Sequence, residues 1–259
     1  MVAQRARKPF YPVKPMAQNI YDNPEFFAGY SRLPRQVRGL DGAPEWPAVR
    51  AMLPTLEGKR VVDLGCGFGW AARWMRAQGA ASVLGIDLSR NMIARARADT
   101  SDAAVQYRIA DIETLALPGA TFELIYSALT FHYIKDFGRL VGMIHKALVP
   151  RGDLVFTIEH PIYMAAANPH WMHGEDGRIT WPVNGYAAEG ERRTDWFVNG
   201  VVKHHRMLGT TLNTLVEAGF VVRQVQEFAP SSEQVNREPE LAEERERPML
   251  VLIAARKQG

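Results

Sequence analysis

Short apolar runs and amphipathic stretches alternate along the middle of the chain. Apolar runs that end in polar residues or glycine occupy residues 61–64, 82–86, 105–109, 122–126 and 154–158. Between them, residues 70–75, 90–99 and 136–148 carry apolar side chains at helical spacing. Strands that alternate with helices indicate an α/β fold, with a parallel sheet covered by helices on both faces. In such sheets, ligands bind beyond the carboxyl ends of the strands.

The N-terminal part of the chain does not follow this alternation. Residues 1–18 are basic, rich in proline and without hydrophobic period, so we expect an extended arm. Residues 19–40 concentrate aromatic side chains, and Asn23-Pro24 is typical of a helix start. With a further helix over residues 44–53, these features predict a helical cap over residues 19–55, which either packs on the domain surface or covers a ligand pocket.

A second departure lies in residues 160–206, which are rich in aromatic residues and histidine. Residues 179–186 and 191–203 are expected to form strands, and Asn199-Gly200 is expected to form a tight turn within the second. A long insertion of this kind usually has a function, so we interpret it as a substrate lid. Beyond it we expect a helix over 210–218, strands over 220–228 and 249–255, and a charged helix over 239–247. Residues 19–259 therefore form a single domain.

A glycine-rich turn follows the first apolar run, in Val61-Val62-Asp63-Leu64-Gly65-Cys66-Gly67-Phe68-Gly69. Glycine lets the backbone approach a ligand closely and adopt positive φ at little cost. The first amide groups of the helix that follows are unpaired and point toward that ligand. The turn therefore predicts a binding site in which Gly65, Cys66 and Gly67 contact the ligand.

The residues around this turn indicate which ligand it binds. Its glycines form G-x-G-x-G and Trp70 stands where the dinucleotide fingerprint requires the third glycine. Asp63 is a poor neighbour for a pyrophosphate and suits a cationic group such as an ammonium. Asp87 ends the second strand, where a carboxylate can accept hydrogen bonds from ribose hydroxyls. A nucleoside with a positive group satisfies both carboxylates, and S-adenosylmethionine fits that description.

With these residues in place, the chain resembles the class I S-adenosylmethionine-dependent methyltransferases. The matching motifs are VVDLGCGFG (61–69), GIDLS (85–89), YRIADIETL (107–115), FELIYSALTFHYI (122–134) and LVPRGDLVFTIEHP (148–161). The flanking segments are similar to the small-molecule branch that includes quinone-biosynthesis methyltransferases. The resemblance implies a Rossmann-like, mostly parallel seven-stranded sheet whose last strand enters antiparallel beside the fifth. It implies methyl transfer to an O, N or C atom of a small-molecule acceptor, with release of S-adenosylhomocysteine.

The resemblance also implies roles for residues at the cofactor. Asp87 is expected on the ribose, Leu88 and Met92 beside the adenine, and Asp111 and Ile112 at the adenine edge, although Met92 is also a plausible core residue. Ser127 begins the segment expected to pass the sulfonium. The helical cap is expected to cover the pocket, with Tyr21, Tyr30 and Arg35 as candidate contacts. Arg35 could meet a carboxylate bidentately.

The catalytic and acceptor-binding candidates lie further along the chain. His132 is the candidate base, since its ordinary pKa near ~6.5 suits proton removal at neutral pH, or else a histidine that shapes the pocket. His160 is a second candidate, which Glu159 could orient. Trp171, Tyr186 and His204 are expected to contact the acceptor from the lid. No pair shows the i, i+4 spacing of a helical metal site, so we expect no metal.

Composition limits the alternatives. The 259 residues have a net charge of +3 and no basic stripe, so we expect no nucleic-acid partner. The single cysteine, Cys66, fits a reducing cytoplasm, and no apolar run predicts a signal peptide or a membrane helix. We expect a monomer or a homodimer. Two other functions stay open: an NAD(P)-dependent oxidoreductase on a related fold, and a non-catalytic S-adenosylmethionine-binding protein.

Overall fold

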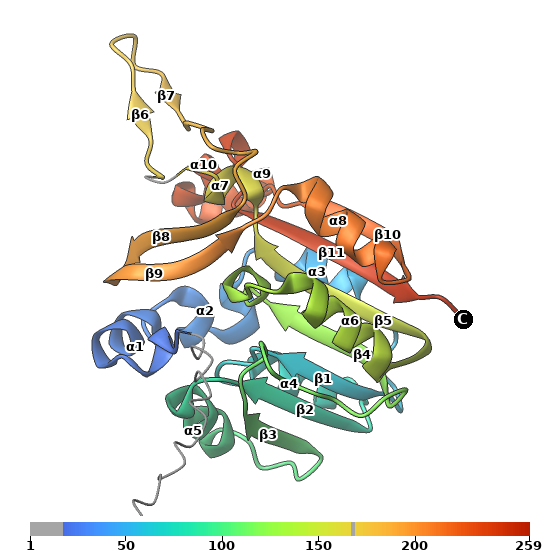
Figure 1. The fold of residues 1–259 in the computed structure, drawn as a ribbon. Helices are drawn as coiled ribbons and strands as arrows, with labels where there is room; N and C mark the ends of the chain where they lie inside the picture. The colour runs from blue at the N-terminus through green and yellow to red at the C-terminus, as the bar shows by residue number, and fades with distance from the viewer. Residues whose placement is uncertain (1–17, 167–168) are drawn as a thin grey trace, which may run out of the picture.

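The protein is built around one twisted seven-stranded sheet (Figure 1). The computed structural model describes residues 18–166 and 169–259. The strands lie in the order β10-β11-β5-β4-β1-β2-β3. Their bounds are β1 Arg60–Leu64, β2 Ser82–Asp87, β3 Val105–Ile109, β4 Phe122–Ala128, β5 Leu148–Glu159, β10 Phe220–Glu227 and β11 Leu250–Lys257. The five strands β5, β4, β1, β2 and β3 are neighbours in that order, and each pairs in parallel with the next. Strand β11 is antiparallel to both β5 and β10. This arrangement confirms the predicted fold, including the antiparallel last strand.

Helices cover both faces of the sheet and enclose two hydrophobic clusters. On one face lie α3 (Trp46–Met52), α4 (Trp70–Ala77) and α5 (Arg90–Ala98), and on the other α6 (Phe137–Ala147) and α8 (Leu208–Glu217). Successive β1 residues point to opposite faces, so Val61 joins the first cluster and Val62 the second. Both are fully buried, which explains why the strand is a continuous apolar run.

Two helices of this framework begin at side-chain caps. Ser89 Oγ accepts a hydrogen bond from Met92 N at the start of α5. Asp136 Oδ1 accepts one from Arg139 N at the start of α6. These caps satisfy amide groups that a helix leaves unpaired at its N-terminus. They fix where each helix starts relative to the strand before it.

Within the described ranges, no helix has the length and apolar character that crossing a membrane requires.

The N-terminal segment folds into short helices beside the carboxyl ends of the strands (Figure 1). These are η1 (Ile20–Asp22), α1 (Pro24–Tyr30), α2 (Pro34–Val37) and η2 (Gly39–Gly42). Asn23 Oδ1 accepts hydrogen bonds from the amides of Glu25 and Phe26, which confirms the helix start at Asn23-Pro24. Residues 1–17 of the predicted arm lie outside the described residues. Gln18 contacts residue 200, where its side chain donates to Gly200 O.

The insertion, residues 160–206, contains α7 (Pro161–Met164) and two hairpins, β6 (Met172–His173) with β7 (Ile179–Thr180) and β8 (Gly190–Trp196) with β9 (Val198–His205). The β8–β9 hairpin lies beside α1, whereas the β6–β7 hairpin projects away from the sheet (Figure 1). The strand predicted over 179–186 is wrong, because only Ile179–Thr180 is extended in a ladder. Pro182 lacks an amide hydrogen and Gly185 adopts a φ of 69°, and both features end strand pairing.

Two further predictions near the insertion need correction. The turn expected at Asn199-Gly200 lies instead at Phe197, which has a φ of 58°, and Trp196 pairs with Val198 across it. The rings of Trp196 and Phe197 both pack against Phe26, and these contacts favour the turn at this position. The charged helix over 239–247 is two short pieces, η4 (Pro239–Ala242) and α10 (Glu243–Glu246), preceded by the unpredicted helix α9 (Ser232–Arg237).

Candidate functional site

A cavity of about 1530 Å³ lies at the carboxyl ends of the parallel strands. Its wall combines the glycine turn, the ends of β1, β2, β4 and β5, the N-terminal segment and the β8–β9 hairpin. Fourteen of the predicted site residues line it: Tyr21, Tyr30, Arg35, Asp63, Gly65, Cys66, Gly67, Asp87, Leu88, Met92, Asp111, Ile112, His132 and His204. Side chains that are up to about 180 residues apart in sequence thus face one space.

Four predicted site residues are not part of this lining. Ser127 is buried and donates to Leu64 O at 2.7 Å, so it joins β4 to β1. His160 Nδ1 accepts from Ile162 N, and its Nε2 lies 2.7 Å from Glu227 Oε1, not against Glu159. Trp171 Nε1 donates to Glu243 Oε2, and Tyr186 packs on His205. All four have contacts that give them a structural role outside the cavity.

The glycine turn brings its backbone directly to the cavity wall. Gly65, Gly67 and Gly69 have φ values of 75°, 52° and 74°, a region that other residues rarely adopt. A Cβ on Gly65 would collide with Thr130 Oγ1, whereas a Cβ on Gly67 would meet open space. Gly65 is therefore needed for the packing of the turn against the segment after β4. Gly67 leaves room for a ligand against the backbone.

Asp87 connects this turn to the start of α5. Its Oδ2 accepts a hydrogen bond from Gly67 N at 2.9 Å, and its Oδ1 accepts one from Ser89 N at 2.9 Å. Burial raises the pKa of Asp87, and the two amide bonds oppose that shift. A carboxylate held rigidly by two amides has lone pairs left for a ribose diol. The donor and acceptor chemistry at this end of the cavity fits a nucleoside.

Asp63 is the second carboxylate at this end and has a different environment. It lies in β1, is 2% exposed, and no hydrogen bond or ion pair engages its carboxylate among the described residues. Burial, and then the negative charge of Asp87, raise the pKa of Asp63 to about 8. A buried acid in this setting gains stability from a cationic ligand group. Together, Asp63, Asp87 and the glycine turn fit S-adenosylmethionine.

The apolar side chains expected around the adenine lie on the same wall. Leu88, Met92 and Ile112 line the cavity, and the Met92 and Ile112 side chains are buried. Asp111 Oδ1 accepts a hydrogen bond from Glu113 N. Arg35 lines the cavity, and its guanidinium forms a bidentate pair with buried Glu45 at 3.0 and 3.3 Å, so the carboxylate that it engages is one of the protein's own.

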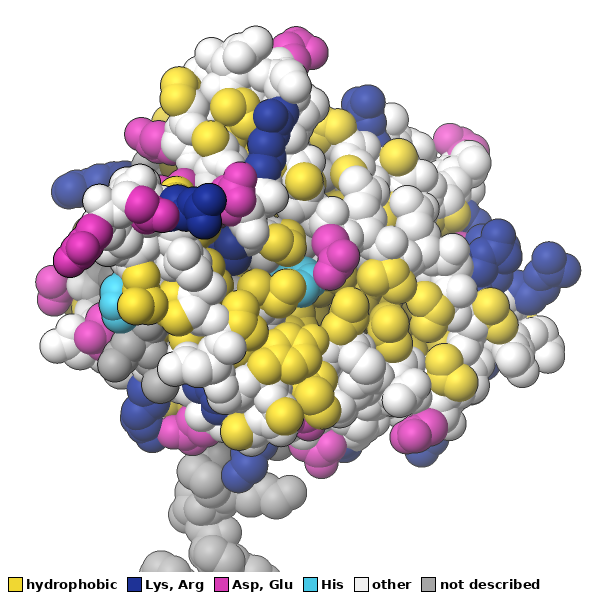
Figure 2. Space-filling view, turned by 90° about the horizontal axis from the view of Figure 1, so that it is seen from above, with side chains coloured by type: hydrophobic (Ala, Val, Ile, Leu, Met, Phe, Trp, Pro, Cys, Tyr) yellow, Lys and Arg dark blue, Asp and Glu magenta, His cyan; other side chains and the backbone are white. Residues whose placement is uncertain are grey.

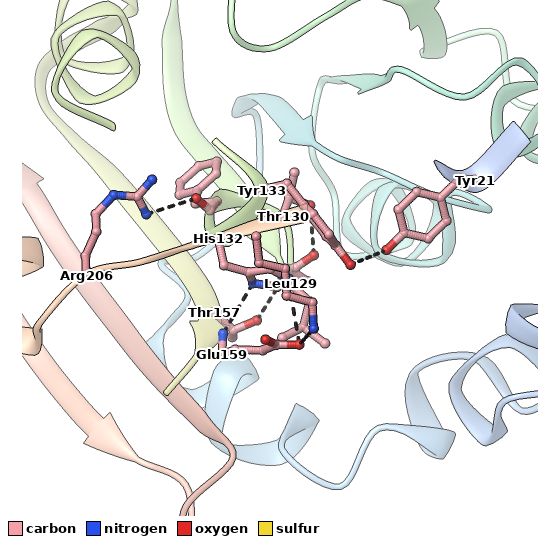
Figure 3. A network of polar contacts seen from close by, with 11 residues as sticks. Tyr21, Leu129, Thr130, His132, Tyr133, Thr157, Glu159 and Arg206 are labelled. Atoms are coloured by element: carbon pink, nitrogen blue, oxygen red, sulfur yellow. Dashed lines mark hydrogen bonds and ion pairs between the residues drawn. The ribbon is translucent and has the colours of Figure 1, made fainter. Parts of the chain in front are cut away.

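A second polar group occupies the end of the cavity near β5 (Figure 3). Lys203 Nζ donates to Glu159 Oε1 at 2.5 Å, and Glu159 N donates to His132 Nδ1 at 3.3 Å. Burial lowers the pKa of His132 to about 4, so the imidazole is neutral at neutral pH. In a neutral imidazole whose Nδ1 accepts a hydrogen bond, Nε2 carries the hydrogen. His132 is therefore a donor toward the cavity, which favours the pocket-shaping alternative over the base.

Sequence reasoning gave Glu159 only the role of orienting His160 and did not include Lys203 among the site residues. Glu159 ends β5 at the carboxyl edge, where the other ligand-facing residues lie. In β9, Val201, Lys203 and His205 are buried while their neighbours are more exposed, a period of two that places Lys203 on the inner face. The sequence of this strand shows no matching alternation of apolar and polar residues, so it gave no signal for Lys203.

Aromatic side chains form the wall between these two polar ends. The hydroxyls of Tyr21 and Tyr133 lie 3.1 Å apart (Figure 3). The ring of Tyr30 packs edge-on against Tyr21 and Trp196. Burial raises the pKa of Tyr30 to about 12, so its hydroxyl stays protonated. The N-terminal segment and the β8–β9 hairpin thus meet over the cavity through apolar contacts.

Comparison with known proteins agrees with this geometry. A methyltransferase domain model matches residues 62–156. The crystal structure of an S-adenosylmethionine-dependent methyltransferase from Mesorhizobium loti is 54% identical, covers 85% of this chain and 100% of its own, and superposes with a TM-score of 0.82. A malonyl-[acyl-carrier protein] O-methyltransferase from Enterobacter lignolyticus is 38% identical over 42% of this chain and 43% of its own length. The phosphoethanolamine N-methyltransferase 3 of Arabidopsis thaliana is 36% identical over 41% of this chain and 22% of its own.

The last two relatives share less than half of their length with this chain, whereas the Mesorhizobium loti protein is matched in full. That match extends well beyond residues 62–156, which the methyltransferase domain model covers. The alternative of an NAD(P)-dependent oxidoreductase therefore falls. The chain belongs to the S-adenosylmethionine-dependent methyltransferases, and S-adenosylmethionine is its cofactor.

Proposed function

We propose that the protein methylates an oxygen or nitrogen atom of a small-molecule acceptor held between the sheet and the β8–β9 hairpin. One observation carries this proposal: a single cavity runs from Asp63 and Asp87 to Glu159 and Lys203. The first two residues suit the cofactor, and the space beyond them is more than a cofactor-binding protein without an acceptor needs. This space weighs against a non-catalytic S-adenosylmethionine-binding protein.

The names of two relatives describe an O-methyltransferase and an N-methyltransferase, which supports an oxygen or nitrogen atom as the methyl acceptor. The surface supports a small acceptor. On the face in Figure 2, lysine and arginine side chains are dispersed among acidic ones and form no stripe along which a nucleic acid would bind. We further propose the cytoplasm as its compartment, because Cys66 is a free, buried thiol.

Each part of the cavity has a role in this function. When bound, S-adenosylmethionine supplies a methyl group that its sulfonium has already activated. The glycine turn, Asp63 and Asp87 hold the cofactor, and His132 and Tyr133 shape the acceptor end. Positioning reactants in this way contributes roughly 7–11 kcal/mol to lowering a barrier. The insertion acts as the substrate lid and the N-terminal segment as the cap, and both exclude water.

The proposal is tested by measuring S-adenosylhomocysteine release with panels of small hydroxyl and amine compounds, total RNA and a protein mixture. We expect turnover with members of the small-molecule panels only. Asp87→Ala should weaken cofactor binding in calorimetry, and Glu123→Gln, at the opposite end of the sheet, should not. Methylation confined to RNA or protein would refute the proposal.

A further inference from the structure

Glu159 has one carboxylate oxygen that accepts no hydrogen bond from the described residues. Its Oε1 accepts the hydrogen bond from Lys203 Nζ, whereas Oε2 is buried and without a hydrogen-bond partner. The residue is only 8% exposed, and it lines the cavity. Among the described residues it is the one carboxylate oxygen that is completely shielded and has no partner, whereas the unpartnered oxygens of Asp63 are not completely shielded. Buried polar atoms are normally hydrogen-bonded, so an orphan oxygen on a residue that lines the cavity indicates a place for a ligand donor.

Lys203 is also incompletely used. It is 4% exposed and its ammonium lies 5.4 Å from the ring centre of Trp196. Of its three N–H groups, one is engaged by Glu159 among the residues that the structure describes. A pair that merely held the β8–β9 hairpin to β5 would not need to leave donors and an acceptor free at a cavity. Burying an ion pair is also costly, and an apolar pair holds a hairpin equally well.

The neighbouring histidine cannot take the proton-accepting role in this arrangement. His132 Nδ1 is occupied by the amide of Glu159, and His132 Nε2, which carries the hydrogen, lies 4.0 Å from Glu159 Oε1. His132 therefore positions the backbone of Glu159 and leaves no lone pair for an acceptor. Of the buried carboxyl groups that line the cavity, Glu45 is paired with Arg35 and Asp63 lies at the cofactor end. Glu159 is therefore the buried carboxyl at the acceptor end.

We propose that the acceptor is a small hydroxyl compound with a flat, phenol-like body, and that Glu159 Oε2 accepts the hydrogen of its reacting O–H. This inference rests on the proposed function. Glu159 takes the proton while the acceptor oxygen forms its new bond to the methyl carbon, and the electron pair of the broken C–S bond stays on sulfur. Lys203 is a positioning residue that fixes Oε1, so that Oε2 is left for the acceptor. Tyr30, Tyr133 and Trp196 provide the aromatic wall against which a flat ring packs.

The proposal is tested first by binding, with phenol and its methyl ether anisole as matched probes. Both have the same ring, but only phenol has a hydrogen for Glu159 Oε2. For the protein saturated with S-adenosylhomocysteine, we expect NMR titration to show phenol binding about tenfold more tightly than anisole. The double variant Glu159→Leu/Lys203→Met replaces the whole pair by apolar residues and should remove this difference. Its affinity for S-adenosylhomocysteine and its melting temperature establish that it is folded.

Turnover provides the second measurement. On phenolic acceptors that the wild type methylates, Glu159→Gln should lower kcat by about 10²–10⁴-fold, the usual contribution of a general base, with KM changed much less. Glu123→Gln is the matched control, because Glu123 also pairs with a basic residue, Arg60, but at the opposite end of the sheet. It should leave both constants unchanged.

Two kinds of failure are distinguishable. Equal binding of phenol and anisole to the wild type, or an unchanged kcat in Glu159→Gln on a small acceptor that the wild type methylates, would overturn this inference and leave the proposed function intact. Methylation of RNA or protein only would overturn the proposed function and this inference with it.

Discussion

Asp63 is a buried acid, and its burial disfavours the charged form of its carboxyl group. With a pKa of about 8, it is mostly protonated at pH 7 in the free protein. A cationic amino group placed beside it favours the ionised form and lowers that pKa. Binding of S-adenosylhomocysteine, which carries the same amino group as the cofactor, should therefore release close to one proton at pH 7.

Calorimetry at pH 7 in buffers of different ionisation enthalpy measures this release directly. Asp63→Asn should bind S-adenosylhomocysteine more weakly and release no proton. The raised pKa of Asp63 also means that the free energy of unfolding of the ligand-free protein falls as the pH rises from about 4 to 8. Over that range the folded state holds a proton that the unfolded state has given up, and each unit by which the pKa is raised corresponds to about 1.4 kcal/mol. Binding without proton release by the wild type would show that the amino group lies elsewhere.

His132 gives a prediction that separates its two possible roles. Its pKa of about 4 means that it does not titrate between pH 6 and 8. Removing the ring in His132→Ala leaves the buried amide of Glu159 without an acceptor, which should lower the free energy of unfolding by about 1–3 kcal/mol in urea denaturation. His173→Ala, on an exposed residue, should have no effect. If kcat of the wild type showed an inflection near pH 6.5, and His132→Ala abolished that inflection, His132 would be the base after all.

Among the helices and strands, the sequence predicted those boundaries that are set by contacts between residues close in sequence. Ser89 and Asp136 cap their helices within three residues of themselves, so both helix starts were readable. The turn at Phe197 depends on contact with Phe26, about 170 residues away in sequence, and no local pattern contains that contact. Lys203 likewise became a site residue only when β9 folded back beside the end of β5. The cofactor end was predictable because consecutive strand ends build it, and the acceptor end was not.

The N-terminal segment connects the cofactor end to the hairpin. Asp22 accepts hydrogen bonds from Ser89 Oγ at 2.6 Å and from the amides of Arg90 and Asn91 at the start of α5. Ser89 N in turn donates to Asp87. A few residues further on, Phe26 packs against Trp196 of β8. One short segment therefore contacts both Ser89, whose amide is bound by Asp87, and the β8–β9 hairpin.

This connection predicts that the cofactor orders the hairpin through Asp22. In hydrogen exchange, S-adenosylhomocysteine should slow the amides of residues 190–205 in the wild type. In Asp22→Ala that protection should fall, while protection of the glycine turn at saturating ligand is retained. Glu25→Ala, on an exposed residue of the same segment, is the matched control. Undiminished hairpin protection in Asp22→Ala would mean that the hairpin is ordered by another route.

For the whole molecule, both ends of the described chain hold the insertion in place. The N-terminal segment contacts the β8–β9 hairpin. Arg247, in the C-terminal part of the chain, contacts the part of the insertion that precedes this hairpin. This guanidinium is 4% exposed and lies 4.3 to 5.3 Å from the ring centres of Tyr163, Trp171 and Trp181. It also pairs with Glu244 at 3.0 Å. Trp171, which the sequence analysis assigned to the acceptor, thus packs together with Trp181 on a side chain of the protein itself.

Arg247 should therefore control how firmly the outer part of the insertion is held. Desolvated cation–π contacts are each worth up to about 2 kcal/mol, so Arg247→Met should release this part while the sheet stays folded. We expect faster limited proteolysis within residues 169–190 and a raised acceptor KM, with cofactor affinity unchanged because Asp63 and Asp87 lie on the strands. Arg237→Met, at an exposed arginine of α9, is the matched control. If Arg247→Met were cleaved no faster than this control, the contact of Arg247 with the three rings would be packing alone, and the lid would be held by the β8–β9 hairpin and the N-terminal segment.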